Sequence, residues 1–164
     1  MPAVAMTDHG NMFGAVEFYN AARKQGIKPI LGCEVYVAPE SRHEKTSKDN
    51  LRDASYHLIL LSESEKGYKN LLKLVTKGYL EGFYYKPRID KELLAEYSEG
   101  LIALSSCVRG EVAHNVNREN VPRAIKVASQ YAEIMGEGNF FLELQNHQLE
   151  NQDRINKEII GIGK

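Results

Sequence analysis

The chain has 164 residues, of which 43% are hydrophobic and 26% are charged, and its formal net charge is −1. This size suits one domain with a real core, and the composition excludes disordered, fibrous and repeat proteins. The near-zero charge gives no overall electrostatic footprint for nucleic acid, so any contact with DNA would need a local patch or residues outside the chain.

The first half of the chain alternates strand and helix patterns. Residues 4–6 are typical of the end of a strand, 11–24 have apolar side chains at helical spacing, and 30–37 form a β-branched and aromatic run. The charged stretch 38–54 lacks periodicity and predicts an exposed loop. A strand at 56–61 and a helix that starts after Ser62 or Ser64 follow, and the helix ends at Gly82.

The second half continues this alternation. A short helix near 90–97 leads into a strand at 101–104, and Pro122 lies in the first turn of a long helix. A strand at 140–144 and a helix at 150–162 complete the chain. About five strand-helix units predict an α/β fold with mainly parallel strands, as one domain over residues 1–164. A complete (β/α) barrel needs more than about 200 residues, so this barrel would be incomplete, and the chain looks cut at both ends.

Two cysteines lie far apart in sequence, and neither a signal peptide nor an apolar run of membrane length is visible. These features predict free thiols in a reducing, cytoplasmic protein that does not contact a membrane.

The most informative segment, Thr7-Asp8-His9-Gly10, directly follows the first strand run. A carboxylate and an imidazole at the exit of a buried strand are typical of hydrolytic metal sites, with His9 as ligand and Asp8 as ligand or as its orienting partner. The alternative is that Asp8 or Asn11 caps the helix that follows.

Three further residues are of metal-ligand type. Glu34 interrupts an apolar run, where an isolated carboxylate is costly unless it is paired or coordinated, although it could also be exposed on an alternating strand. His57 begins its apolar run rather than ending it, which fits a barrel ligand less well and leaves a structural histidine equally open. Cys107 follows a strand and could supply a thiolate or simply fill the core.

Other polar residues suggest substrate contacts. His147 follows the strand at 140–144 and could face the same edge. Lys86 and Arg88 in an aromatic loop, together with Arg109, could bind a phosphate or DNA. The alternative is that the loop tyrosines pack and the charges keep the loop soluble. The chain has no phosphate-binding glycine loop, nucleophile elbow or Cys-x-x-Cys pair, which leaves metal-assisted hydrolysis as the enzyme class.

Several long segments resemble one known family. They are similar to the polymerase and histidinol phosphatase (PHP) domain of bacterial DNA polymerase III alpha subunits, over residues 7–19, 26–34, 79–90, 100–107 and 141–147. The resemblance implies a distorted, TIM-like (β/α)7 barrel that binds up to three zinc, manganese or magnesium ions. The matching ligands are His9, Glu34, His57 and Cys107, and for His57 the resemblance outweighs its position in the strand.

The resemblance also implies a function. Some family members are metal-dependent phosphoesterases, including 3′–5′ exonucleases, within a DNA-directed DNA polymerase whose partners are DNA and other replicase subunits. The first His-x-His motif and the last Asp-x-His motif of the family lie outside this chain, so the chain alone should have little activity and its open edge could self-associate. The alternatives are a silent module that braces the polymerase and docks a proofreading subunit, and a stand-alone phosphatase.

Overall fold

The computed structural model describes residues 1–45 and 55–164. Part of the loop expected at 38–54 therefore lies outside the described residues. The elements of the described chain, in order, are β1 (Ala3–His9), α1 (Ala15–Lys24), β2 (Lys28–Val37), β3 (Tyr56–Ser62), α2 (Glu65–Leu80), β4 (Arg88–Ile89), α3 (Lys91–Glu96), β5 (Leu101–Leu104), α4 (Glu111–Asn117), α5 (Val121–Met135), β6 (Phe140–Phe141) and α6 (Gln152–Ile162).

The strands form one mixed sheet in the order β1-β2-β3-β5-β6, with β4 paired to β2. β1 and β2 are parallel, as are β2 and β4, and β5 and β6. β3 runs antiparallel to both of its neighbours, β2 and β5. The α/β class is confirmed, but the expectation of mainly parallel strands overlooked β3. The sequence predicts no helix between residues 37 and 56. A strand parallel to its predecessor needs a crossover connection that is usually helical, so the lack of a predicted helix was a sign that β3 is antiparallel to β2.

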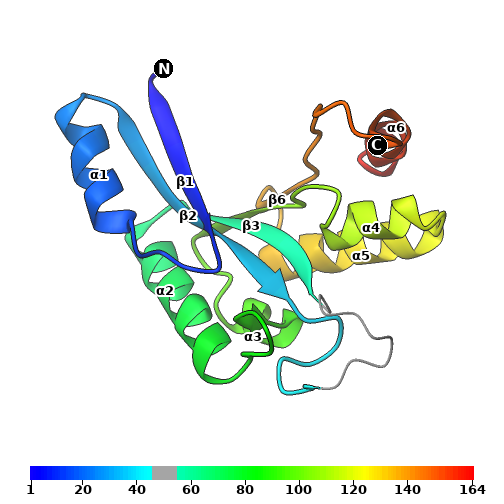
Figure 1. The fold of residues 1–164 in the computed structure, drawn as a ribbon, viewed down its shortest axis with the longest axis horizontal. Coiled ribbons are helices and arrows are strands. Elements are labelled where there is room, and N and C mark those ends of the chain that lie inside the picture. Colours follow the sequence, from blue (N-terminus) through cyan, green and yellow to red (C-terminus); the bar gives the residue numbers. More distant parts are fainter. Residues whose placement is uncertain (46–54) are drawn as a thin grey trace.

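Helices lie against one face of the sheet (Figure 1). The strand side chains on that face are 3% exposed or less: Cys33, Val35, Leu58, Leu60 and Ala103. Their neighbours in sequence point to the opposite face because strand side chains alternate. On that face Ile59, Leu61, Ile102 and Leu104 stay partly exposed, and Phe141 is 50% exposed. We call this second surface the open face.

Local sequence signals explain most helix boundaries. Ser64 accepts a hydrogen bond from the Gly67 N–H at the start of α2, and Asn120 and Pro122 begin α5. Neither Asp8 nor Asn11 caps α1, which begins at Ala15 after a turn in which Asn11 accepts the Phe13 N–H. Helix α4 and the short strand β4 were not expected, because segments of seven and two residues are too short for a repeating hydrophobic pattern to be recognised.

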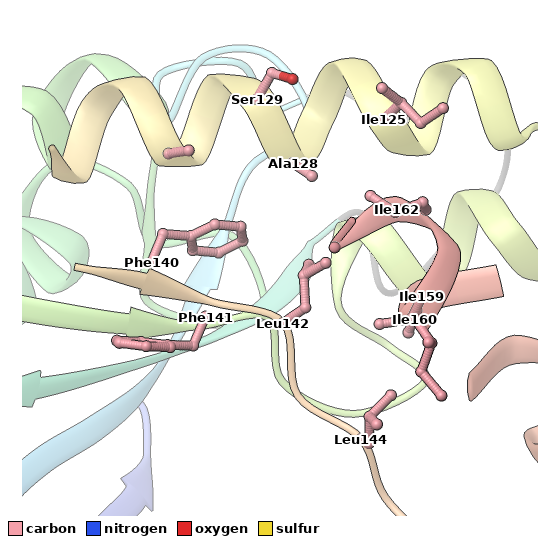
Figure 2. Close-up of a pocket in the computed structure, with 12 residues that line it drawn as sticks. Ile125, Ala128, Ser129, Phe140, Phe141, Leu142, Leu144, Ile159, Ile160 and Ile162 are labelled. Atoms are coloured by element: carbon pink, nitrogen blue, oxygen red, sulfur yellow. The ribbon is translucent and has the colours of Figure 1, made fainter. Parts of the chain in front are cut away.

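The sheet is open between its end strands, β1 and β6. An apolar groove with a volume of about 510 Å³ lies beside β6, between α5 and α6 (Figure 2). It is lined by side chains that include Ile125, Phe141, Leu142, Leu144 and Ile160. Among the helices of the described residues, none is both long and apolar enough to cross a membrane.

Candidate metal centre

The antiparallel direction of β3 places His57 with the other candidate ligands. His9 ends β1, and it lies opposite Glu34 in the parallel β1–β2 register. His57 lies near the start of β3 and pairs with Tyr36, two residues beyond Glu34 on β2. The start of an antiparallel strand meets the ends of its neighbours, so His57 lies at the same edge as His9 and Glu34. Its early position in the apolar run is therefore no objection to a shared site.

Glu34 is the centre of a hydrogen-bonded cluster. Its Oε1 atom lies 2.7 Å from Nδ1 of His9 and 2.7 Å from Nδ1 of His57. Its Oε2 atom accepts a hydrogen bond from the Ser106 hydroxyl at 3.4 Å. Cys107 completes the cluster, with Sγ at 3.9 Å from Nδ1 of His57. The structure thus brings together four of the candidate ligands, His9, Glu34, His57 and Cys107.

The cluster runs from the interior to the surface. The side chains of Glu34 and His57 are 10% exposed, whereas that of His9 is 70% exposed. The Glu34 carboxylate is therefore stabilised by partners rather than by water, as a buried charge requires. His9 lies at the rim, where it can change its orientation at little cost.

The charges of these groups depend on one another. Burial favours the neutral form of Glu34, but hydrogen bonds and charges of His57 and His9 outweigh it and lower the pKa of Glu34. Burial alone would lower the pKa of His57, yet Cys107 and Glu34 raise that pKa to about 9. The hydrogen bond from His57 is the largest cause that lowers the pKa of Cys107. Without a metal, these contacts favour an imidazolium at His57 beside the Glu34 carboxylate.

The imidazole, carboxylate and thiol groups of this cluster are suitable ligands for a divalent metal. One buried nitrogen of the cluster also lacks a hydrogen-bond partner in the described part of the chain. Nε2 of His57 is buried and has no hydrogen-bond partner among the described residues. When Nδ1 donates to Glu34, the neutral ring leaves a lone pair on Nε2, which is the arrangement of many metal-binding histidines. However, no group of three His, Cys, Asp or Glu side chains within residues 1–45 and 55–164 is already spaced to hold an ion. The imidazole nitrogens of His9 and His57 are hydrogen-bonded to the Glu34 carboxylate instead.

Asp8 and His147 lie apart from this cluster. The Asp8 carboxylate is near Gly14 at the start of α1, where a Cβ added to Gly14 would lie 3.6 Å from Oδ2. The backbone carbonyl oxygen of Asp8 accepts a hydrogen bond from the Cys33 thiol. His147 is exposed in the connection to α6, and its backbone N–H donates to Gln152. Neither side chain has a hydrogen bond to the cluster in the described part of the chain.

The three candidate phosphate-binding cations have different environments. Arg88 is 3% exposed and donates to the backbone oxygens of Gly82 and Glu44. Lys86 is half-buried, and its Nζ lies 4.5 Å from the centre of the Tyr36 ring. Arg109 is exposed, its backbone N–H lies 3.5 Å from Sγ of Cys107, and its carbonyl oxygen accepts the His57 N–H.

Sequence reasoning missed three residues at this edge. Ser106 contacts Glu34, and Tyr36 places its ring edge against His57 with the ring centroids 5.2 Å apart. Glu143 follows β6, its backbone N–H donates to the Ser105 hydroxyl, and its buried Oε2 has no partner among the described residues. A signal was present for Ser106, because polar residues that closely follow the strand expected at 101–104 are expected at the same edge.

Comparisons with known proteins identify the family of this chain. Residues 1–147 match the PHP domain family. DNA polymerase III subunit alpha of Borreliella burgdorferi is 48% identical over 160 residues, which are 98% of this chain and 14% of that protein. The proteins of the same name from Treponema pallidum and Thermus aquaticus are 46% and 47% identical over 93% and 95% of the chain. The chain spans 13% of the length of each of these two. From this match over most of its length, the chain belongs to the PHP domain family.

Proposed function

We propose that this chain is part of the alpha subunit of a bacterial replicative DNA polymerase III and carries one side of a metal-dependent phosphoesterase site of the 3′–5′ exonuclease type. The observation that carries the proposal is the convergence of His9, Glu34, His57 and Cys107 at one sheet edge, with Glu34 and Cys107 both near Nδ1 of His57. The polymerase assignment is supported by relatives that share the fragment at 42–49% identity.

The donors suit zinc or manganese, and magnesium is a third possibility that the carboxylate supports. We propose up to three ions in an intact site. Such ions lower the pKa of a bound water and stabilise the leaving oxygen of a phosphodiester. Residues of this chain would orient the side chains that bind the metal. Glu34 would hold the orientation of the His57 ring through Nδ1, and the Ser106 hydroxyl donates to the Glu34 carboxylate.

We further propose that residues 1–164 are one segment of a TIM-like (β/α)7 barrel whose other strands come from the rest of the subunit. The open face and the groove beside β6 support this proposal (Figure 2). Backbone groups of Phe140 and Leu142 point away from β5, because N–H and C=O directions alternate along a strand, so β6 can accept a further strand. A Cβ on Gly163 would lie 3.5 Å from Leu142, so the segment that follows α6 lies beside this groove.

That strand would follow α6. It would lie parallel to β6, because a helix that joins two strands of one sheet normally forms a right-handed crossover between parallel strands. It would add ligands to the edge where Glu34 lies and cover the half-exposed apolar side chains of the open face. DNA and other replicase subunits are then the partners of the whole polymerase, in the cytoplasm. The same groove supports a second candidate function, in which the domain mainly braces the polymerase, because its apolar surface must be covered in either case.

The test is metal content and nuclease activity of the full-length protein that contains this chain. Glu34→Gln and His57→Gln should each reduce bound metal, measured by elemental analysis, and reduce nucleotide release from a single-stranded 3′ end by 10-fold to 100-fold. Glu137→Gln, on an exposed loop residue, is the matched control. Full metal content with unchanged nucleotide release in Glu34→Gln would contradict the phosphoesterase site and leave the bracing function.

A further inference from the structure

The aromatic loop between α2 and β4 has an unusual backbone. The Tyr84 N–H donates to the Lys86 carbonyl oxygen at 3.0 Å, so the chain reverses over three residues. Tyr85 lies at the tip with φ of 59°, in the left-handed region that a bulky residue rarely adopts. Its side chain is 65% exposed, although its ring packs edge-on against Tyr84 with the ring centroids 4.7 Å apart. The fold therefore maintains a strained turn that presents one aromatic ring to solvent.

Lys86 points from this loop toward the metal centre. Its Nζ lies over the Tyr36 ring, 4.5 Å from the centroid, and 3.4 Å from the Tyr36 hydroxyl. The edge of that ring meets His57. A Cβ on Gly10 would lie 2.9 Å from the Tyr36 ring and 3.0 Å from Pro87, so the turn after His9 packs on the same group. One buried tyrosine ring thus lies between the ammonium group and the candidate ligands.

The two cations of the loop have different roles. Arg88 is buried, and its guanidinium is bonded to backbone oxygens of Gly82 and Glu44, at 3.2 and 2.8 Å. It also lies 5.0 Å from the Tyr84 ring centroid. These contacts hold the loop together. No carboxylate of residues 1–45 or 55–164 forms an ion pair with Lys86, so its positive charge is not neutralised by a neighbour there.

We propose that residues 84–86 bind the terminal nucleotide of a single-stranded DNA substrate, with the Lys86 ammonium on a phosphate and the Tyr85 ring stacked on the base. This inference rests on the proposed phosphoesterase function and names the substrate end that the site receives. Sites for single-stranded nucleic acid combine a cation that contacts the backbone with an aromatic ring that stacks on a base, independent of sequence. Here both groups come from one hydrogen-bonded loop beside the edge at which hydrolysis would occur.

Photochemical cross-linking tests the inference without relying on catalysis. The probe is a single-stranded oligodeoxynucleotide whose 3′-terminal base is 5-iodouracil, bound to the full-length protein that contains this chain. We expect a cross-link in the peptide that contains Tyr85, identified by mass spectrometry, and its loss in Tyr85→Ala. Lys86→Met should raise the probe concentration for half-maximal cross-linking about 10-fold, whereas Lys86→Arg should retain most of the binding. Lys126→Met, on an exposed lysine of α5, is the control and should have no effect.

The kinetics distinguish substrate binding from a structural role of Lys86. Lys86→Met should raise KM for nucleotide release and leave kcat within about 2-fold, because the lost interaction exists before the reaction. Cross-links only at other peptides, or equal cross-linking by wild type and Lys86→Met, would overturn the inference even if the protein holds its metals. A wild-type protein without bound metal would contradict the proposed phosphoesterase function instead. A fall in kcat and metal content in both Lys86 variants would show that the loop supports the fold and does not bind substrate.

Discussion

Nδ1 of His57 lies 2.7 Å from Oε1 of Glu34, although the two residues come from neighbouring strands that run in opposite directions. The contact links the start of β3 to the end of β2. It also makes the protonation of each group depend on the other, because an imidazolium stabilises the carboxylate and the carboxylate stabilises the imidazolium.

This contact predicts how the stability of the metal-free chain changes with pH. His57 has its pKa raised from 6.5 to about 9, so its contribution is complete below pH 6.5 and is lost as the pH rises through about 9. The pKa of Glu34 is lowered from 4.5, so its contribution is complete above pH 4.5 and is lost as the pH falls further. The pair therefore stabilises the fold most between pH 4.5 and 6.5, by roughly 1–3 kcal/mol.

Denaturant unfolding in chelator at several pH values measures this effect. His57→Gln should remove the loss of stability between pH 6.5 and 9. With a bound metal the slope should reverse in the same range, because ligands must lose their protons to coordinate the ion. Equal slopes with and without added zinc or manganese would contradict coordination through His57.

The two cysteines should differ in reactivity. Cys107 is half-buried, and the hydrogen bond from His57 lowers its pKa, whereas burial raises the pKa of Cys33 to about 12. Because the thiolate is the nucleophile, iodoacetamide should modify Cys107 at least about 10-fold faster than Cys33 near neutral pH. Peptide mass spectrometry over a time course gives both rates. Bound metal should protect Cys107, and the absence of protection in a metal-loaded protein would remove Cys107 from the ligand set.

A close approach of two backbones makes Gly67 sensitive to substitution. A Cβ at Gly67, in the first turn of α2, would lie within 1.7 Å of the Gly100 carbonyl oxygen. Gly67→Ala must therefore displace α2 from the turn before β5, and we expect a loss of about 2–4 kcal/mol. Gly161→Ala is the matched control, since no atom lies within 4 Å of the added group in α6, and it should stabilise by about 0.5–1 kcal/mol. Similar changes in the thermal midpoint of both variants would show that the close approach is absent.

Two leucine variants test whether the open face is covered in the longer protein. Leu60 faces the helices and is 0% exposed, whereas Leu104 on β5 faces the open side and is partly exposed. In the 164-residue chain, Leu60→Ala should cost about 3 kcal/mol and Leu104→Ala about 1 kcal/mol. In a chain extended through the remaining barrel strands, the Leu104→Ala cost should rise toward that of Leu60→Ala. An unchanged Leu104→Ala cost would mean that no further strand covers this face.

Sequence patterns determined the helix and strand types of most elements and the residues of the candidate site. Apolar residues at helical spacing predict α1, α2 and α5 because each helix buries one stripe against the sheet. His9, Glu34, His57 and Cys107 stand out because polar residues of ligand type rarely accompany buried strand runs without a function. The short elements α4 and β4 escaped notice because they are formed by tertiary packing rather than by a local period.

Strand direction and mutual contact were decided only by the tertiary structure. The sequence leaves the polarity of β3 open, since periodicity is the same for a strand read in either direction, and His57 therefore looked misplaced. Pairing of β3 antiparallel to β2 and β5 brings His57 to the common edge. Residues distant in sequence become one site only when hydrogen bonding between strands fixes register and direction, and no local pattern contains that information.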